Sequence, residues 1–375
     1  MSTTTRASSP FLSTFPGRYY YDPALYEQEQ TNIFSRMWIY AGVANTLPEP
    51  GDYIVVTVAN ESILVVRNKQ GDLQAFLNVC RHRGARLCSE ASGRLKGSIQ
   101  CRYHAWTYGL DGKLIGAPNV LHMDDFDRVA FGLLPVALEV WQGLIWLNLS
   151  DNPPSLTEQL TDPAVQTFGG NGPVARYGIA HLKVAKTIVY DVQANWKLIM
   201  ENTLECYHCS PMHPELCALL PTFRMGAIDD GTGAEFAQHV EAFTITGKGS
   251  RPFLPGLLTE DLRRYYGFFA MPNAFLNLLS DHVVIDSLQP LGPALTRVTS
   301  AWLFDPAVMA SVGFDPMDAV EILDLVNRQD WIVCELVQQG VTSKAFAPGG
   351  NYTPQEYHIR GFVDYILEKL AISQS

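Results

Sequence analysis

The chain has 375 residues, of which 47% are hydrophobic, and a formal net charge of −11. This length accommodates one large domain or two ordinary ones, and the acidic balance argues against broad binding to nucleic acids or anionic membranes. No run of about 18 apolar residues occurs, so a transmembrane helix is not expected. The seven cysteines are odd in number, and several stand beside histidines. This pattern predicts a reducing, cytoplasmic location and cysteines that bind metal rather than a disulfide framework.

The first predicted element is a helix near the N-terminus. Asp22 and Pro23 are typical of an N-cap followed by proline at the first helical position, and residues 24–38 have helical periodicity. From Gly51 onward the pattern changes to short β runs with turn residues between them. The strands expected there are YIVVTV (53–58), SILVVR (62–67) and LQAFLNV (73–79).

Two hairpin signals and a boundary complete the first half. Asp111-Gly112 is a hairpin turn signal, and LEVWQGLIWLNL (138–149) indicates a strand pair that turns at Gln142-Gly143. The segment SDNPPS (150–155) is polar, holds two prolines and lacks periodicity, which indicates a domain boundary. The sequence therefore predicts an all-β domain over residues 40–155.

The second half combines helices and strands that are segregated along the chain. The strands expected there are 183–192, 236–245, 282–288 and 296–304. The helices expected there are 195–208, a long helix from Asp315-Pro316 to Gly340, and a final helix opened by the capping box Thr353–Glu356. Because helices and strands do not strictly alternate, this half is predicted to be α+β with an antiparallel sheet.

A first group of metal-ligand residues lies in the β domain. Cys80-Arg81-His82 is followed, after 18 residues, by Cys101-Arg102-Tyr103-His104. Each half follows a predicted strand, so two loops can each bring one thiolate and one imidazole to a common centre. Such ligands suit a tetrahedral zinc ion, although zinc fingers usually pair Cys with Cys and His with His. They also suit a Rieske [2Fe–2S] cluster, in which the cysteines hold one iron and the histidines hold the other.

The segments CRHRGARLC and CRYHAWTYGLDGKL closely resemble the Rieske domain of ring-hydroxylating-type oxygenases. The cluster ligands that this resemblance implies are Cys80, His82, Cys101 and His104. The family usually has a proline where this chain has Arg102, a departure that touches no ligand. Cys88 is expected to be a packed or free thiol. Imidazole ligands raise the cluster potential, so the centre can accept electrons from a ferredoxin or flavin reductase.

A second group of residues lies in ENTLECYHCSPMHPE (201–215). Cys206 and Cys209 form a C-x-x-C, and as i,i+3 neighbours on the predicted helix they suit zinc. A structural zinc site usually has a second C-x-x-C or a histidine pair at short range, and none follows here. The same segment therefore needs a second interpretation.

That second interpretation uses the carboxylate and the two imidazoles of the segment. Glu205 and His208 are also i,i+3 neighbours, and Pro211 is expected to stop the helix so that His213 turns back toward His208. Two imidazoles and one carboxylate, with open coordination positions, form the facial triad of non-heme Fe(II) oxygenases. Open positions are what activation of O2 requires.

The third ligand of such a triad would be a distant carboxylate. Asp330 lies within a largely apolar stripe of the long helix, where an unpaired charge is costly. Coordination to a cation would offset that cost, and so would a salt bridge. Spacing alone leaves both interpretations open.

The segments NWKLIMENTLECYHCSPMHPE and QDWIVCELVQQGVTSKAF resemble the catalytic domain of the same oxygenase family. The resemblance implies that His208, His213 and Asp330 bind a mononuclear iron, and it leaves Cys206 and Cys209 as bystanders. The parts of the chain that it implies are an N-terminal segment and helix that pack on the catalytic domain (1–39), the Rieske domain (40–155) and a helix-grip type catalytic domain (156–375).

The resemblance also gives Glu205 a role. In this family an acid at that position links a Rieske histidine of one subunit to an iron-ligating histidine of its neighbour. A carboxylate that accepts hydrogen bonds from both imidazoles would orient the rings and couple the two centres. His104 is the expected Rieske partner, and a homotrimer is the expected assembly, with electrons crossing a subunit boundary. Asn202 is expected to form a hydrogen bond near the iron.

The two centres together imply an oxygenase that receives NAD(P)H electrons through a separate reductase. The segments PNAFLNLLSDHVVIDSLQPLGP (272–293) and CELVQQGVTSKAF resemble the branch of glycine betaine, carnitine, stachydrine and choline monooxygenases. These enzymes hydroxylate quaternary ammonium compounds, in several cases with loss of an N-methyl group as formaldehyde. Glu205 agrees with this branch, because the branch that acts on aromatic rings usually has Asp there. The alternatives are a Rieske oxygenase for an aromatic ring or an aromatic O-methyl ether, and a non-catalytic metalloprotein.

A quaternary ammonium group has no hydrogen-bond donor, so its recognition depends on the faces of aromatic rings. Eight aromatic residues of region 222–290 are candidates, of which two or three are expected to face a ligand. They are Phe223, Phe236, Phe243, Tyr265, Tyr266, Phe268, Phe269 and Phe275.

Overall fold

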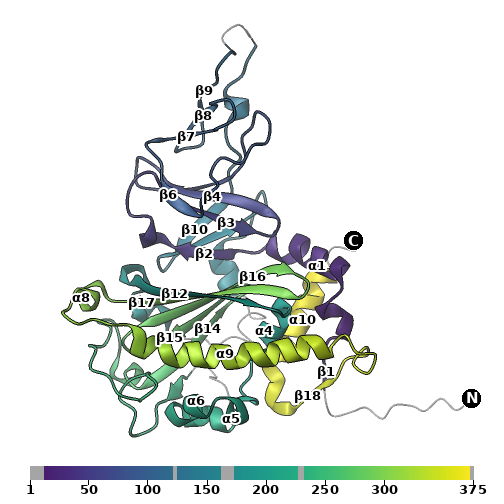
Figure 1. The fold of residues 1–375 in the computed structure, drawn as a ribbon, viewed down its shortest axis with the longest axis vertical. Coiled ribbons are helices and arrows are strands. Elements are labelled where there is room, and N and C mark those ends of the chain that lie inside the picture. Colours follow the sequence, from purple (N-terminus) through teal and green to yellow (C-terminus); the bar gives the residue numbers. More distant parts are fainter. Residues whose placement is uncertain (1–11, 121–124, 162–172, 227–231, 372–375) are drawn as a thin grey trace, which may run out of the picture. The chain divides into compact units, whose positions relative to one another are not determined.

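The chain forms two compact units. The computed structural model describes residues 12–120, 125–161, 173–226 and 232–371 (Figure 1). One unit, here called the β unit, comprises residues 33–159, and the other, here called the α+β unit, comprises the residues before 33 and from 160 onward. The predicted limits at 39/40 and 155/156 stay predictions. None of the helices over the described residues has the length and apolar character needed to cross a membrane.

Over its described residues, the β unit contains three small antiparallel sheets. Their strand orders are β5-β4-β3-β6, β10-β11-β2 and β7-β8-β9. The bounds are β2 Ile39–Val43, β3 Asp52–Val58, β4 Glu61–Arg67, β5 Leu73–Leu77, β6 Ser92–Arg94, β7 Ser98–Gln100, β8 Thr107–Gly109, β9 Leu114–Gly116, β10 Ala137–Trp141 and β11 Leu144–Asn148. Both predicted hairpins are confirmed. Gly112 has φ +79° in the longer connection between β8 and β9. Gln142 and Gly143 have φ 51° and 77°, as a two-residue turn between twisted strands requires.

The α+β unit is built on a six-stranded antiparallel sheet in the order β12-β17-β16-β15-β14-β13. Its strands are β12 Lys183–Val192, β13 Ala234–Glu235, β14 Arg264–Ala270, β15 Ala274–Leu278, β16 Val283–Gly292 and β17 Leu295–Phe304. At the middle of the sheet, Asp286 of β16 lies opposite Phe275 of β15 and Ser300 of β17. The α+β fold class with an antiparallel sheet is confirmed.

Helices pack on this sheet, and the long helix α9 (Met317–Gly340) runs across it in Figure 1. The others are α1 Pro23–Glu29, α4 Trp196–Thr203, α5 Cys209–Met212, α6 Pro214–Leu219, α7 Pro221–Arg224, α8 Pro306–Met309 and α10 Tyr357–Ala371, with the short α2 Leu156–Leu160 at the unit boundary. Asp22 and Asn195 cap α1 and α4 through their side chains, as typical N-cap residues do. The capping box of Thr353 and Glu356 is also present.

Three predicted elements differ from the structure. The N-terminal helix is α-helical only to Glu29 and continues as a π-helix over Gln30–Phe34. Residues 236–245 are not a strand, because backbone N–H groups there donate to nearby carbonyl groups, for example Val240 N to Ala237 O at 2.9 Å. The helix predicted over 195–208 ends at Thr203.

The early end of α4 has a local cause. The carboxylate of Glu205 accepts hydrogen bonds from the backbone N–H groups of Tyr207 and His208, at 3.3 Å for His208. These N–H groups are therefore satisfied without the carbonyl groups of the preceding turn, which a continuing helix would need. The chain is free to turn before α5.

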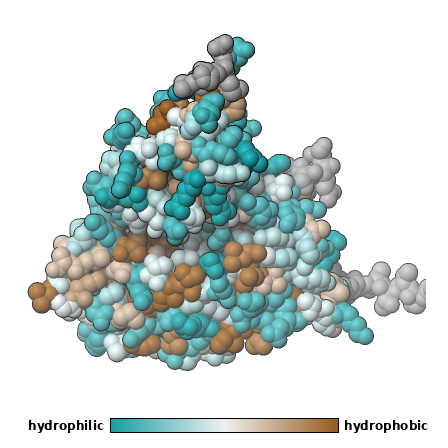
Figure 2. Space-filling model, turned by 45° about the horizontal axis from the view of Figure 1, so that its top comes forward, coloured by the Kyte–Doolittle hydropathy of each residue, from teal (hydrophilic) through white to brown (hydrophobic). Residues whose placement is uncertain are grey.

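Surface character differs between the two units. On the face shown in Figure 2, the β unit is largely hydrophilic, whereas the α+β unit carries several apolar patches. Exposed apolar side chains on α9 include Ile332 and Leu336, which are 57% and 60% exposed. One side of α9 thus carries exposed apolar side chains.

Candidate metal sites and substrate cavity

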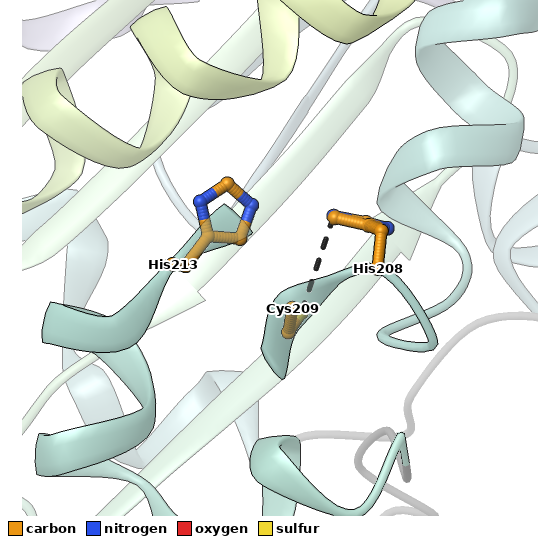
Figure 3. Close-up of side chains that lie close together, drawn as sticks. All are labelled: His208, Cys209 and His213. Atoms are coloured by element: carbon orange, nitrogen blue, oxygen red, sulfur yellow. Dashed lines mark hydrogen bonds between the residues drawn. The ribbon is translucent and has the colours of Figure 1, made fainter. Parts of the chain in front are cut away.

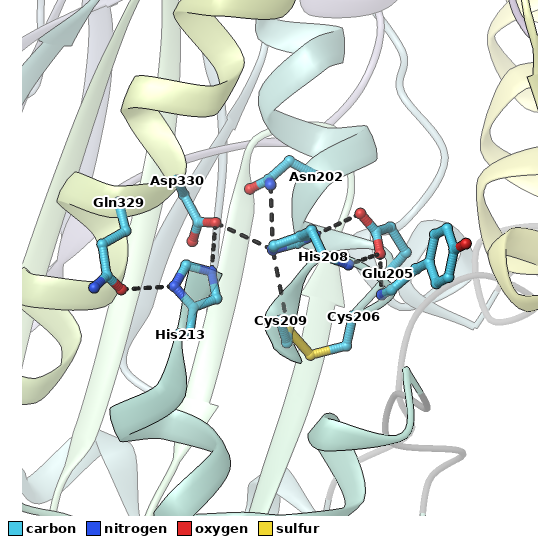
Figure 4. The surroundings of a disulfide bond; sticks show 9 residues. Asn202, Glu205, Cys206, His208, Cys209, His213, Gln329 and Asp330 are labelled. Atoms are coloured by element: carbon cyan, nitrogen blue, oxygen red, sulfur yellow. Dashed lines mark hydrogen bonds and ion pairs between the residues drawn. A yellow bond between two sulfur atoms is a disulfide. The ribbon is translucent and has the colours of Figure 1, made fainter. Parts of the chain in front are cut away.

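Two histidines and one aspartate converge in the α+β unit. Both Nε2 atoms approach the same carboxylate oxygen, Oδ1 of Asp330, at 3.2 Å from His208 and 2.9 Å from His213. The two imidazole rings lie 5.2 Å apart and nearly perpendicular to each other (83°). Figure 4 shows Asp330 on α9 facing the two histidines, which come from the segment after α4.

The other nitrogen of each ring is held by a neighbouring side chain. His208 Nδ1 donates to Glu205 Oε1 at 2.5 Å, and His213 Nδ1 donates to Gln329 Oε1 at 2.7 Å. Histidines that bind a metal through one nitrogen usually donate the other N–H to such an acceptor, which fixes the ring orientation. Both Nε2 atoms are thereby directed to a common point beside Asp330, and the donor set fits a divalent iron ion.

The electrostatics of this group also fit a cation. Burial lowers the pKa of His208, but hydrogen bonds to Asp330 and Glu205 outweigh burial and raise the pKa to about 10. Burial raises the pKa of Asp330, and its hydrogen bonds to His208 and His213 more than reverse this, so the pKa lies below its ordinary value. Positive charge beside Asp330 is thus favoured, and a metal ion would supply it in exchange for protons.

A second grouping of potential ligands overlaps this one. His208, Cys209 and His213 have ligand atoms within 4.8 Å of one another (Figure 3). Cys209, however, is joined to Cys206 by a disulfide bond, and a thiolate is the form of cysteine that binds metal. Asp330 is therefore the better third ligand.

The disulfide corrects one prediction. The cysteines were expected to serve metal binding instead of disulfide pairing, with Cys206 and Cys209 as bystanders. These two remain outside the donor set but are bonded to each other, because the turn after α4 brings their Cα atoms to 4.9 Å, within the range of disulfides. Cys80, Cys88 and Cys101 are free and buried.

The turn at His213 has a different cause from the one predicted. Pro211 lies inside α5 and does not stop a helix before His213. Pro214 begins α6, and a proline disfavours the helical conformation of the residue before it. His213 has φ −125° and ψ 62°, so Pro214 is the residue that separates α5 from α6 and turns the His213 ring inward.

Asn202 lies beside this group. Its Nδ2 atom is 3.4 Å from His208 Nε2, and its side chain comes from the last turn of α4 (Figure 4). Asn202 also lines the cavity beside these residues.

A cavity of about 130 Å³ opens next to the three converging residues. Its floor is the sheet, which contributes side chains at alternate positions of β14 to β17, and its other walls come from α4, α5 to α7 and α9. Among the eight aromatic residues considered, five line the cavity, and how many of them face a ligand stays a prediction. They are Phe223, Phe243, Tyr265, Phe269 and Phe275, and Trp331 joins them from α9.

One lining residue, Asp286, was missed in the sequence. It accepts hydrogen bonds from Asn277 Nδ2 at 2.7 Å and from the hydroxyl of Ser300. Burial raises the pKa of Asp286 to about 6, and the bonds from Ser300 and Asn277 limit the rise. Strand alternation was the available signal, because Asp286 occupies the same face of the strand as Val284 and Leu288, where an apolar residue is expected.

The Cys/His residues of the β unit lie on two loops of similar shape. Cys80 N donates to Ala85 O at 2.8 Å, and Gly84 N donates to Cys80 O at 3.0 Å. The second loop has the same two bonds at the same sequence offsets. Cys101 N donates to Trp106 O at 2.8 Å, and Ala105 N donates to Cys101 O at 3.0 Å. The residue four positions after each cysteine has a positive φ, 71° at Gly84 and 57° at Ala105. The two loops present their ligands as a matched pair.

The two cysteines and the two histidines on these loops differ in solvent exposure. Cys80 and Cys101 are buried, whereas His82 and His104 are exposed, with ring centroids 4.7 Å apart. Two buried thiols opposite two exposed imidazoles match a Rieske cluster, in which each pair holds its own iron. Tyr108 supports the thiol side, because its hydroxyl lies 3.3 Å from Cys80 Sγ. The residues present therefore fit a [2Fe–2S] centre.

Comparison with known proteins identifies the class of each unit. The family model described as Rieske [2Fe-2S] domain matches residues 37–127, and the model described as ring hydroxylating alpha subunit (catalytic domain) matches residues 179–372. The chain is 32% identical over 390 residues to the glycine betaine monooxygenase oxygenase subunit of Chromohalobacter salexigens, covering 95% of this chain and 86% of that protein. It is 39% identical over 201 residues to the carnitine monooxygenase oxygenase subunit of Acinetobacter pittii, covering 54% and 53%.

A solved structure is similar over nearly the whole chain. The quaternary ammonium Rieske monooxygenase CntA in complex with L-carnitine has a TM-score of 0.75 and 27% sequence identity, and the match covers 96% of each chain. The fold and the two sites thus define an iron-dependent oxidoreductase. The chain belongs to the Rieske oxygenase alpha subunits, whose cofactors are a [2Fe–2S] cluster and a mononuclear iron.

Proposed function

We propose that the chain is the oxygenase component of a monooxygenase that hydroxylates an N-methyl carbon of a quaternary ammonium compound such as glycine betaine. The hydroxylated carbon would then leave as formaldehyde. The observation that carries this proposal is the meeting of His208, His213 and Asp330 at the edge of a cavity lined by aromatic rings. A metal ion with open coordination positions can activate O2, and the faces of aromatic rings can hold a cationic substrate next to it.

The ligand assignment has two parts. In the α+β unit His208, His213 and Asp330 would hold the mononuclear iron. The residues that would hold the cluster are Cys80, His82, Cys101 and His104. With both centres bound, the cluster supplies single electrons and the ferrous iron supplies O2 activation. The chain itself orients the donors through Glu205 and Gln329 and keeps most water from the substrate through the aromatic lining.

Glu205 would connect the two centres. One of its oxygens already accepts the Nδ1–H of His208, and its side chain is only 11% exposed. Each carboxylate oxygen has a second lone pair, so Glu205 can also accept an N–H from His104 of a neighbouring copy. Inter-subunit electron transfer is described for the solved quaternary ammonium Rieske monooxygenase.

A closed ring of like subunits would supply that neighbour, and we infer a homotrimer. The exposed apolar residues Ile332 and Leu336 of α9 provide surface that such an assembly can bury. A separate ferredoxin or flavin reductase would deliver the electrons of NAD(P)H.

The test is a substrate screen in which the purified protein, a reductase and NADH are combined with a panel of betaines and aromatic compounds. Substrate-dependent formaldehyde release and NADH consumption with a betaine are the expected results. Turnover of an aromatic ring or of an aromatic methyl ether, with no response across the betaines, would favour the alternative Rieske oxygenase. Metal analysis that finds zinc and no acid-labile sulfide would overturn the oxygenase itself.

A further inference from the structure

The charged groups of the cavity have one unexplained member. Glu205 contacts His208, and Asp330 contacts both histidines. Asp286 stands apart from them on β16, and the described part of the chain shows no ion pair to it. Its oxygens accept hydrogen bonds from the neutral side chains of Asn277 and Ser300. A buried carboxylate without a cationic partner is costly unless a ligand compensates it.

The surrounding hydrogen bonds keep Asp286 in one position. Tyr265 donates to Asn277 Oδ1 at 2.9 Å, and Asn277 in turn donates to Asp286. On the other side Asn327 Nδ2 donates to Ser300 Oγ at 3.3 Å, and the Ser300 hydroxyl donates to Asp286. The network extends across β14, β15, β16 and β17 to α9, so the carboxylate is part of a rigid cavity wall.

The composition of the cavity favours positive charge. Three carboxylates line it, and among the residues that the structure describes its lining contains neither lysine nor arginine. A divalent ion at Asp330 would still leave one negative charge uncompensated, with the imidazoles neutral. Phe275, directly opposite Asp286 on the neighbouring strand, and Phe269, which packs against Phe275 at 4.4 Å between ring centroids, add ring faces beside that charge.

We propose that Asp286 is the specificity-determining counter-charge for the ammonium group of the substrate. This inference rests on the proposed function and names the residue that distinguishes a cation from a neutral molecule of the same shape. A quaternary ammonium cannot form a hydrogen bond, so a fixed carboxylate beside ring faces recognises it by charge and surface alone. A neutral isostere fills the same space without that attraction.

The experiment measures binding by calorimetry, with the iron-loaded full-length protein and two matched pairs of ligands. The pairs are choline with 3,3-dimethylbutan-1-ol, and glycine betaine with 3,3-dimethylbutanoate, in which carbon replaces the ammonium nitrogen. In the Asp286→Asn variant we expect affinity for the cationic member to fall about 10- to 100-fold, while affinity for the neutral-headed member stays within about 3-fold.

Two variants separate charge from structure. Ser300→Ala removes one hydrogen bond to Asp286 but keeps its charge, so we expect less than about a 5-fold loss for the cation. Asp324→Asn removes a carboxylate of the same helix that holds Asp330 but lies outside the cavity, and it should leave binding unchanged. Iron content and thermal stability of each variant are measured in parallel.

The outcomes are distinct. Equal losses for both members of a pair, or equal effects of Asp286→Asn and Ser300→Ala, would overturn the role of Asp286 and leave the proposed function standing. If the wild-type protein binds no quaternary ammonium compound while it turns over an aromatic one, the proposed function fails and this inference fails with it.

Discussion

The two candidate metal sites are built in opposite ways. The Cys/His residues of the β unit lie on two short loops that repeat the same hydrogen bonds, so each loop forms half of the site by local structure. The site in the α+β unit joins a loop after α4 with the middle of α9, and neither part forms a ligand set without the other. A site of the first kind is a local motif, whereas a site of the second kind depends on the whole fold of its unit.

The largest effect is expected from the shared carboxylate. Asp330→Ala should abolish binding of the mononuclear iron and reduce turnover by roughly 10³-fold or more, because two imidazoles alone hold Fe(II) weakly. Iron analysis, labile sulfide and NADH-coupled turnover are the measurements. The visible spectrum of the cluster should persist. Asp324→Ala, on the same helix but paired with Tyr190 and Arg328, is the matched control and should keep full iron content.

A change among the Cys/His residues should remove only the metal centre of the β unit. Cys101→Ser should remove labile sulfide and the visible absorption of the cluster, and turnover should fall by roughly 10³-fold, because it removes a thiolate that we propose as a cluster ligand. Mononuclear iron should remain near one per chain. Cys88→Ser is the control, since Cys88 is a free buried thiol of the same unit. Loss of both irons in Cys101→Ser would show that the two sites do not form independently.

A smaller effect is expected where the two sites would communicate. Glu205→Gln should leave both metals bound but slow turnover roughly 10- to 100-fold, because an amide is a poorer acceptor for two imidazole N–H groups. Rapid-mixing reduction of the cluster should stay fast while its reoxidation with substrate and O2 slows. Glu241→Gln, an exposed change, serves as the control. Unchanged reoxidation would contradict the bridging role.

The smallest effect concerns the hydroxyl beside Cys80. Tyr108→Phe should lower the cluster reduction potential by roughly 40 mV, which corresponds to about 1 kcal/mol for one hydrogen bond to a sulfur that gains charge on reduction. Protein-film voltammetry of the full chain gives the potential directly. Tyr53→Phe, in the same hydrophobic cluster, should shift it much less. An upward shift would mean that the hydroxyl stabilises the oxidised cluster.

The contrast between a locally formed site and a site that depends on the whole fold also explains how much could be predicted from the sequence. The Cys/His loops, the hairpin turns and strands such as 183–192 depend on residues that are close in the sequence. Local sequence patterns were therefore sufficient to predict them. The position of Asp330 beside His208 depends on packing of α9 against α4, and spacing alone left a salt bridge as an equal interpretation. The end of α4 at Thr203 and the turn at His213 were missed, because they depend on Glu205 accepting backbone N–H groups and on Pro214. Asp286 was missed because its only signal is a single charged residue on a strand face whose alternating neighbours are apolar.

The alternation of the central strands has a consequence for change of substrate. Cavity-facing positions on β14, β15 and β16 recur at every second residue, while the side chains proposed to bind iron come from a loop and from α9. Mutation of Phe269, Phe275 or Leu288 can therefore reshape the chamber and leave the donors in place. Combinatorial libraries confined to these alternating sites offer a route to new oxidations with the same electron supply, and natural divergence of such enzymes can follow the same path.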